Sequence, residues 1–138
     1  MSSSVMVRGR GIVPGTVAGM ALVGPTSVPG WNAFDLSSGI VLEKGNVLCG
    51  QSIRERVLIL NGARGSTAWA TQFHQARVAG VGPAALVFPR VDSRVANACI
   101  VSQVPTVADL ERDIFQIVNS GDWVSVDGDE GVVIITPR

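Results

Sequence analysis

The alternation of apolar and polar positions divides the chain into short apolar runs separated by turns rich in glycine and proline. Residues 56–60 form a β-branched and apolar run that predicts a buried strand, and residues 84–88 form a second such run. Between them, residues 67–79 predict a helix that ends at a turn containing glycines and a proline. A strand, a helix and a second strand in this order predict one right-handed parallel crossover.

The predicted helix has one apolar face. Trp69, Phe73 and Ala76 recur at the spacing i, i+4, i+7, so we expect them to pack on the sheet. The single histidine, His74, lies about 100° away from Phe73 around the helix and is expected at the surface or at an edge. It lies two turns beyond Ser66, which is too far for an obvious Ser–His dyad.

Further strands are predicted on both sides of the crossover, at residues 5–7, 12–13, 16–23, 40–42 and 98–101. Gly19 is a candidate β-bulge in the longest of these runs. Near the end of the chain, residues 122–127 and 131–136 flank a Gly-Asp-Glu turn and predict a β-hairpin.

A second helix is predicted over residues 106–120, with Thr106 as its cap and with Leu110, Ile114 and Val118 as its apolar stripe. Residues 89–95, which contain Arg90, Asp92 and Arg94, are expected to form a polar connection. Two longer loops are predicted at residues 24–38 and 43–53.

The first of these loops is long for a compact domain, and long loops are usually functional or disordered. It carries Trp31 and Phe34, which disorder does not favour. We therefore expect the loop to be ordered against a partner or as a lid.

The count of seven or eight short strands and two helices in 138 residues predicts a single domain, residues 1–138. An α/β or α+β fold with a curved or barrel-like sheet fits this count, although the pattern alone does not fix the topology.

The candidate chemistry lies between the first crossover strand and the helix, at Arg64-Gly65-Ser66. The first turn of a helix leaves backbone N–H groups without partners, and glycines allow a ligand to approach the backbone closely. Ser66 stands at the N-cap position, so one interpretation is a helix cap only. The other is a serine base, activated by positive charge and facing a bound acid beside Arg64.

Composition narrows the classes of function. The net charge is zero and no basic run is present, so nucleic-acid binding is not expected. No apolar run is long enough to span a membrane, and the N-terminal stretch lacks the apolar region of a signal peptide, so we expect a cytoplasmic protein. The apolar share of 46% against 16% charged residues indicates a large sheet core or a face buried against a partner.

The two cysteines, Cys49 and Cys99, are far apart in the sequence and lack C-x-x-C companions. A disulfide framework or a self-contained metal or Fe–S site is therefore not expected. Cys99 lies in an apolar run and is expected to be buried, whereas Cys49 lies in a loop. A serine hydrolase is also disfavoured, because no G-x-S-x-G elbow is present.

Nearly the whole chain resembles the small subunit, or swivelling domain, of aconitase X, a branch of the aconitase superfamily. The most specific element is Arg64-Gly65-Ser66 after a strand. The other matching stretches are residues 11–22, 25–30, 35–39, 48–53, 57–60, 83–87 and 121–131. The resemblance implies a swivelling β/β/α domain.

Three loop segments depart from the family pattern. The serine-rich run that usually follows the motif is Thr67-Ala68-Trp69-Ala70 here. The usual Gly-Gly-Val-Asp is replaced by residues 30–35, and the His-Pro before Leu-x-Gly-x-Ser is Asn46-Val47. These changes lie where substrate contacts are expected, so they affect substrate identity more than reaction class.

The resemblance implies a hydro-lyase that removes water from a small hydroxy acid. Ser66 would be the catalytic base, with Arg64, Gly65 and Thr67 binding the substrate. An Fe–S cluster is expected on a large partner subunit rather than on this chain, and whether Cys49 approaches it stays open. Of the two substrates known in the family, the loop departures favour cis-3-hydroxy-L-proline over mevalonate 5-phosphate. The alternative is a stand-alone small-acid-binding or regulatory module with the same fold.

Overall fold

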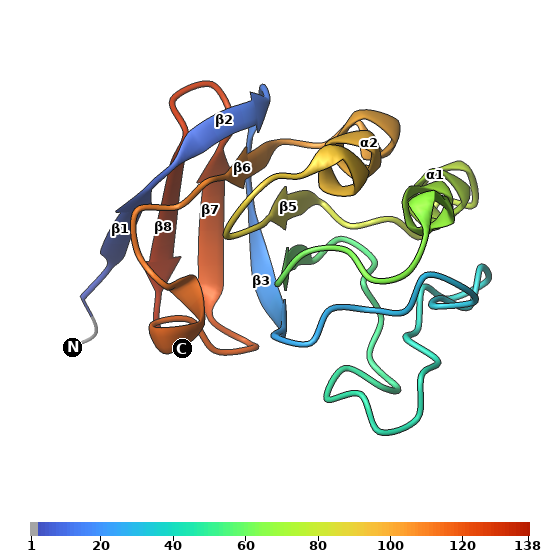
Figure 1. Ribbon diagram of the computed structural model, residues 1–138. Helices are drawn as coiled ribbons and strands as arrows, with labels where there is room; N and C mark the ends of the chain where they lie inside the picture. Colours follow the sequence, from blue (N-terminus) through green and yellow to red (C-terminus); the bar gives the residue numbers. More distant parts are fainter. Residues whose placement is uncertain (1–2) are drawn as a thin grey trace.

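One eight-stranded sheet runs through the computed structural model, which describes residues 3–138 (Figure 1). Met1 and Ser2, the start of the N-terminal stretch considered above, lie outside the described residues. The strands lie in the order β1-β8-β7-β3-β4-β5-β6-β2. Their bounds are β1 Val5–Arg8, β2 Arg10–Val13, β3 Thr16–Gly24, β4 Val57–Leu60, β5 Ala85–Val87, β6 Thr106–Ala108, β7 Trp123–Asp127 and β8 Val132–Thr136.

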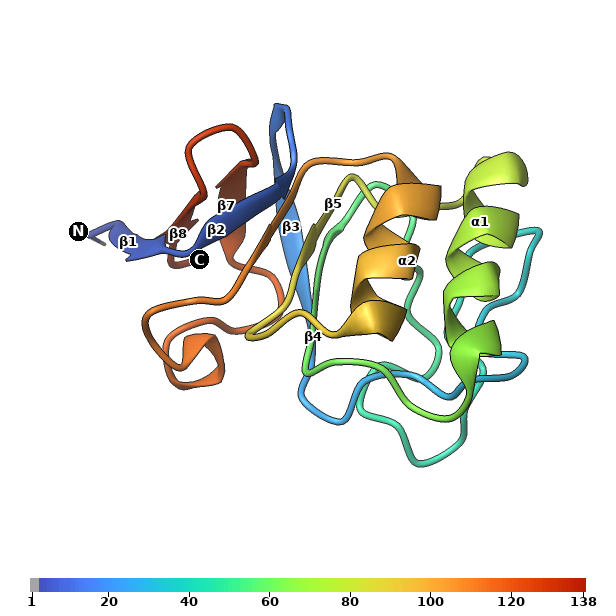
Figure 2. The same cartoon turned by 45° about the horizontal axis from the view of Figure 1, so that its top comes forward.

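Two α-helices and two short 3-10 helices complete the fold of residues 3–138. They are η1 Thr67–Ala70, α1 Thr71–Val78, α2 Ser93–Ser102 and η2 Ile114–Gln116. Figure 2 shows α1 and α2 side by side on the same side of the central strands. In the described part of the chain, no helix has the length and hydropathy that crossing a bilayer requires.

The predicted parallel pairing of the two crossover strands is confirmed. β3, β4, β5 and β6 pair in parallel, and η1 with α1 connects β4 to β5. The predicted hairpin is confirmed as well, because β7 and β8 pair antiparallel from Trp123↔Thr136 to Asp127↔Val132. The sheet therefore has an antiparallel half and a mostly parallel half, which meet at β3.

The two faces of β4 bury its side chains in two different hydrophobic clusters. Leu58 and Leu60 pack toward α1 and α2, where Trp69 and Phe73 are fully buried as the helical spacing predicted. Val57 and Ile59 pack toward the antiparallel half of the sheet. Because both faces of this strand are covered, it is a continuous apolar run rather than an alternating one.

The expectation of a barrel-like sheet holds only in part. The sheet curves so that its antiparallel half covers one face of the parallel half. β1 and β2 end the strand order, and in the described residues they pair only with β8 and β6. β1 and β2 are consecutive in the sequence but lie at opposite ends of the sheet, and no strand pairing among residues 3–138 closes it into a barrel.

Two segments were predicted with the wrong type of secondary structure. Residues 98–101, expected as a strand, belong to α2, which begins at Ser93 because Asp92 accepts a hydrogen bond from the Val95 amide. Residues 106–120, expected as a helix, start with strand β6 instead. Pairing of Thr106 and Val107 with β5 on one side and β2 on the other overrides the local helical pattern.

Two smaller expectations also fail. The register of β3 against β7 continues evenly through Gly19, and the irregularity in the sheet lies instead in β2, between Gly11 and Val13. Within residues 40–42, Ile40 and Val41 form isolated bridges rather than a strand, because their partners are the neighbouring loop residues Phe34, Cys49 and Ser52.

Candidate functional site

Ser66 is the N-cap of η1, as its position in the sequence predicted. Its Oγ accepts a hydrogen bond of 3.3 Å from the Ala68 amide, and its side chain remains exposed. The continuous helix expected over residues 67–79 is divided into one 3-10 turn and α1, so the dipole of α1 begins five residues beyond Ser66. Positive charge near Ser66 must therefore come mainly from side chains.

Gly65 gives the turn before Ser66 its shape. Its φ of +78° lies in the left-handed region, where a side chain is unfavourable. The loop at Gly30 lies directly against it, because a Cβ on Gly30 would come within 2.9 Å of the Arg64 carbonyl oxygen and 3.5 Å of the Gly65 Cα. Thr67, the fourth predicted site residue, is exposed beside Ser66.

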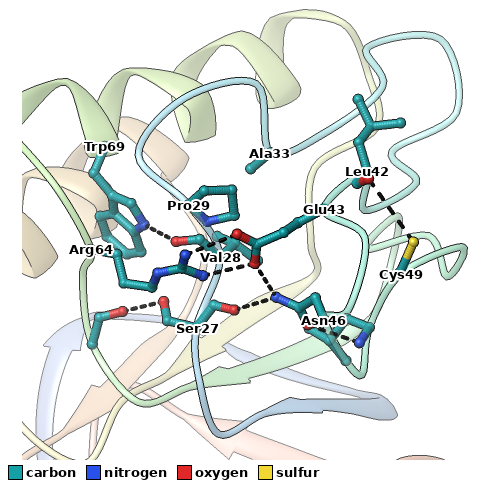
Figure 3. A network of polar contacts seen from close by, with 12 residues as sticks. Ser27, Val28, Pro29, Ala33, Leu42, Glu43, Asn46, Cys49, Arg64 and Trp69 are labelled. Atoms are coloured by element: carbon teal, nitrogen blue, oxygen red, sulfur yellow. Dashed lines mark hydrogen bonds and ion pairs between the residues drawn. The ribbon is translucent and has the colours of Figure 1, made fainter.

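Arg64 forms a bidentate ion pair with Glu43, a partner that sequence reasoning missed. Its Nη1 and Nη2 each donate a hydrogen bond of 2.9 Å to one carboxylate oxygen of Glu43 (Figure 3). These bonds hold the pKa of Glu43 at about 2, and a weaker contribution comes from Asn46. Arg64 is thus close to charge-neutral with its partner, although each terminal nitrogen keeps a second N–H for another acceptor.

Asn46 connects this ion pair to the loop that precedes Gly30. Its Nδ2 donates to Glu43 at 3.0 Å and to the Ser27 carbonyl oxygen at 2.9 Å, and its Oδ1 accepts from the Leu48 amide. The Ser27 hydroxyl donates to the carbonyl oxygen of Gly62 in the motif loop. Asn46, where the sequence departs from the family pattern, therefore belongs to a polar network that joins three segments: residues 24–38, residues 43–53 and the residues between β4 and η1.

The long loop at residues 24–38 is ordered, as its aromatic residues predicted, and it packs against helices of its own chain. Trp69 Nε1 donates to the Val28 carbonyl oxygen at 3.0 Å. Gln72 donates to the Pro29 carbonyl oxygen at 2.8 Å and accepts from the Ala33 amide at 2.7 Å. Trp31 nevertheless points outward and is 83% exposed.

A pocket of about 480 Å³ lies between this loop and α1. Trp31, Phe34 and Leu42 line it with Gln72 and Gln75 of α1. Ala68 also borders it, whereas Arg64 and Ser66 do not. The pocket is therefore adjacent to the motif and separate from the Ser66 hydroxyl.

Arg94 is a second guanidinium at the motif, contributed by the first turn of α2. Its Nη1 donates to the Gly65 carbonyl oxygen at 2.6 Å. Its Nη2 lies 3.4 Å from Asp92 Oδ2, a weaker contact. The segment was expected to be a polar connection, so sequence reasoning did not place this arginine at the site; Asp92 as a helix cap is the signal that would have done so.

The remaining candidates lie apart from the motif. His74 is exposed on α1, Cys99 is buried with its pKa raised to about 12 by desolvation, and Cys49 is exposed in its loop. Within residues 3–138, no three His, Cys, Asp or Glu side chains gather into a metal-ligand set. The donor set of the described residues thus does not fit an Fe–S cluster held by this chain.

The ion pair makes a prediction about stability and pH. The Glu43 pKa rises from about 2 in the folded chain to its ordinary 4.5 on unfolding, so its stabilising contribution is complete above pH 4.5 and disappears as the pH falls toward 2. In Glu43→Gln, the loss of unfolding free energy relative to wild type should be constant near neutrality and shrink between pH 4.5 and 2. Urea unfolding at several pH values measures this, with Glu130→Gln on an exposed turn as the control. A difference that does not change with pH would contradict the assignment.

Known proteins are similar to this chain over almost its whole length. Residues 6–135 match the family described as the aconitase X swivel domain. The phosphomevalonate dehydratase small subunit of Methanocella arvoryzae is 33% identical, over 94% of this chain and 98% of that protein. The protein of the same name from Methanosarcina acetivorans is 30% identical, over 97% of this chain and 94% of its own length.

Two solved structures have a fold similar to that of this chain. The crystal structure of Thermococcus kodakaraensis aconitase X in its holo-form superposes with a TM-score of 0.86 at 27% identity, covering 95% of this chain and 98% of that chain. The solution NMR structure of a UPF0107 protein superposes with a TM-score of 0.80 at 31% identity, covering 94% and 97%. The chain therefore belongs to the aconitase X swivel domain family. Within that family it is a dehydratase small subunit, that is, part of a hydro-lyase.

Proposed function

We propose that this chain supplies Ser66 as the catalytic base of a two-subunit dehydratase that acts on mevalonate 5-phosphate. The observation that carries the proposal is the match from end to end with proteins named phosphomevalonate dehydratase small subunits. The sequence alone favoured cis-3-hydroxy-L-proline, but the relatives described above are not named for that substrate. Mevalonate 5-phosphate is therefore the better-supported member of the same substrate class.

The reaction removes a proton from the carbon beside the carboxylate and a hydroxyl group from the neighbouring carbon. A serine alkoxide can take a weakly acidic C–H proton only where water is excluded and positive charge stabilises it. Ser66 is exposed in the isolated chain; Arg64 lies two residues before it in the sequence, and Arg94 donates to the carbonyl oxygen of the adjacent Gly65. We infer that docking of a large subunit excludes water from Ser66 and completes the site.

Substrate binding falls on the residues around the serine. The free N–H groups of Arg64 can donate to a carboxylate or phosphate while Glu43 balances the charge of its guanidinium. Gly65 and Thr67 border the same exposed turn, where the backbone is open to a ligand. The resemblance assigns the Fe–S cluster to the large subunit.

Apolar side chains beside the site support a docking face for the large subunit. Trp31, Leu36, Leu42 and Val47 are 83%, 44%, 41% and 66% exposed; Trp31 and Leu36 lie in the loop at residues 24–38, Val47 lies in the loop at residues 43–53, and Leu42 lies between the two loops. Exposed apolar residues gathered beside a functional loop are typical of a protein interface.

The test is to purify the chain anaerobically with its large subunit and to assay both acids. We expect a complex that converts mevalonate 5-phosphate to an unsaturated acid, followed by proton NMR through the new vinylic signal. Much lower kcat/KM with cis-3-hydroxy-L-proline is expected. A preference for hydroxyproline would overturn the substrate. A chain that forms no complex and binds a small acid by itself would favour the alternative of a stand-alone module.

A further inference from the structure

We propose that Arg94 is a positioning residue for Ser66, acting through the carbonyl group of Gly65. The inference rests on the proposed function for its catalytic consequence, and on the contacts of the turn for its structural part. Arg94 reaches the motif from α2, lies 29 residues beyond Gly65 in the sequence, and so acts on the turn from outside it.

The first step of the argument is the freedom of the peptide between Gly65 and Ser66. Glycine adopts positive and negative φ with similar ease, so rotation of a peptide plane beside Gly65 meets little steric resistance. In a planar trans peptide the N–H of Ser66 points opposite to the carbonyl of Gly65. Whatever fixes the Gly65 oxygen therefore also fixes the direction of the Ser66 amide and the start of η1.

The second step is that Arg94 fixes this oxygen. The bond from Nη1 to the Gly65 oxygen is 2.6 Å long and charge-assisted, which makes it stronger than a bond between neutral groups. On its other side the turn lies against Gly30, whose backbone leaves no room for a side chain. Arg94 and Gly30 thus hold the turn between them, while the exposed side of Ser66 remains open.

The third step separates the roles of the two arginines. Both terminal nitrogens of Arg64 are hydrogen-bonded to the Glu43 carboxylate, so Arg64 connects the motif to the loop that contains Glu43. Arg94 makes one weaker contact of 3.4 Å with Asp92, which also caps α2, and its main partner is the motif backbone. The guanidinium of Arg94 therefore both orients the turn and places positive charge next to Ser66.

Arg94→Ala provides the structural test, with Arg90→Ala on an exposed position of the preceding loop as the control. In the free chain, we expect amide NMR signals of Gly65 and Ser66 to shift or broaden in Arg94→Ala while those of the sheet stay in place. Arg90→Ala should leave the Gly65 and Ser66 signals unchanged. Unchanged Gly65 and Ser66 signals in Arg94→Ala would overturn the proposal, whatever the protein's activity.

The catalytic test is a double-mutant cycle in the reconstituted enzyme. Arg94→Ala should lower kcat about tenfold to a hundredfold with little change in KM, since small misplacements of a catalytic group have effects of this size. In the Ser66→Ala background, removing Arg94 should have almost no further effect. An equal loss in both backgrounds, or a rise in KM alone, would overturn the positioning role and indicate direct substrate binding. Near-normal turnover of Ser66→Ala by itself would instead contradict the proposed function.

Discussion

Ser66→Ala should reduce turnover by about two to four orders of magnitude while the chain folds and assembles normally, because a positioned general base contributes a factor of this size. Folding should be largely unaffected because the side chain is exposed and its single hydrogen bond to the Ala68 amide is 3.3 Å long. Loss of a helix cap costs about 0.5–2 kcal/mol, and we expect the low end here. Steady-state kinetics of the reconstituted enzyme and thermal unfolding of the free chain measure the two effects.

A matched variant separates the cap from the base. Asp113 caps η2 as Ser66 caps η1, since its carboxylate accepts from the amide two residues ahead, that of Phe115, at 3.1 Å. Asp113→Ala should therefore lower stability by a similar amount and leave turnover unchanged. If Ser66→Ala also retains near-normal turnover, then Ser66 is only a helix cap and the base lies elsewhere.

The part of the site that could be predicted is the part encoded locally. The apolar run before the motif, the glycine, and a serine at the first helical turn are neighbours in sequence, and together they predict β4, the turn and η1. The hairpin of β7 and β8 was predictable for the same reason, because its turn residues lie directly between the two strands in the sequence. Local signals are sufficient when an element's partners lie next to it.

Elements that depend on distant partners were predicted less well. Residues 106–108 form a strand because β5 pairs with them on one side and β2 on the other. The apolar residues that were predicted to line one face of a helix follow this strand and do not lie on one continuous helix. Ile114 and Val118 are buried, as predicted, but Ile114 belongs to the 3-10 helix η2 and Val118 lies in the loop that follows it. The predicted number of helices was right because α2 replaced the helix that is absent.

The same reasoning explains the two missed site residues. Glu43 and Arg94 lie 21 and 29 residues from the motif residues that they contact, in segments that carry no motif of their own. For Arg94, the available signal was the α2 pattern in which Val95, Ala98, Cys99 and Ser102 are buried at helical spacing after an Asp cap. For Glu43 we find no local signal, since an ion pair across two loops is set by the fold.

The second large effect is expected at Trp69, which connects the site to the core. Trp69 is fully buried, packs on Phe73 with ring centroids 4.7 Å apart, and donates to the Val28 carbonyl oxygen. Trp69→Ala should lower the free energy of unfolding by about 3–5 kcal/mol, as is typical of a large aromatic removed from a core. Because whole domains are stable by about 5–15 kcal/mol, urea unfolding should show a markedly less stable chain.

Trp69→Phe distinguishes packing from the hydrogen bond. Phenylalanine keeps an aromatic ring in the core but leaves the Val28 carbonyl without its donor, which costs about 1–3 kcal/mol. Val28 precedes Gly30, and Gly30 packs on the motif turn, so this change should also lower turnover of the assembled enzyme. Trp123→Phe, at a strand position that is 53% exposed, should change neither property.

Phe88→Leu is the comparison that makes the link between loop and site testable. Phe88 packs near Trp69 with ring centroids 6.2 Å apart and is equally buried, but it directly follows β5 and has no side-chain hydrogen-bond donor for the Val28 carbonyl oxygen. It should therefore lower stability, with a smaller loss of turnover at the same loss of unfolding free energy. Equal losses of turnover at matched stability would mean that the loop at Val28 does not position the motif. A larger loss of turnover in Trp69→Phe would show that the indole hydrogen bond to the Val28 carbonyl oxygen helps to hold the turn that carries Ser66 in position.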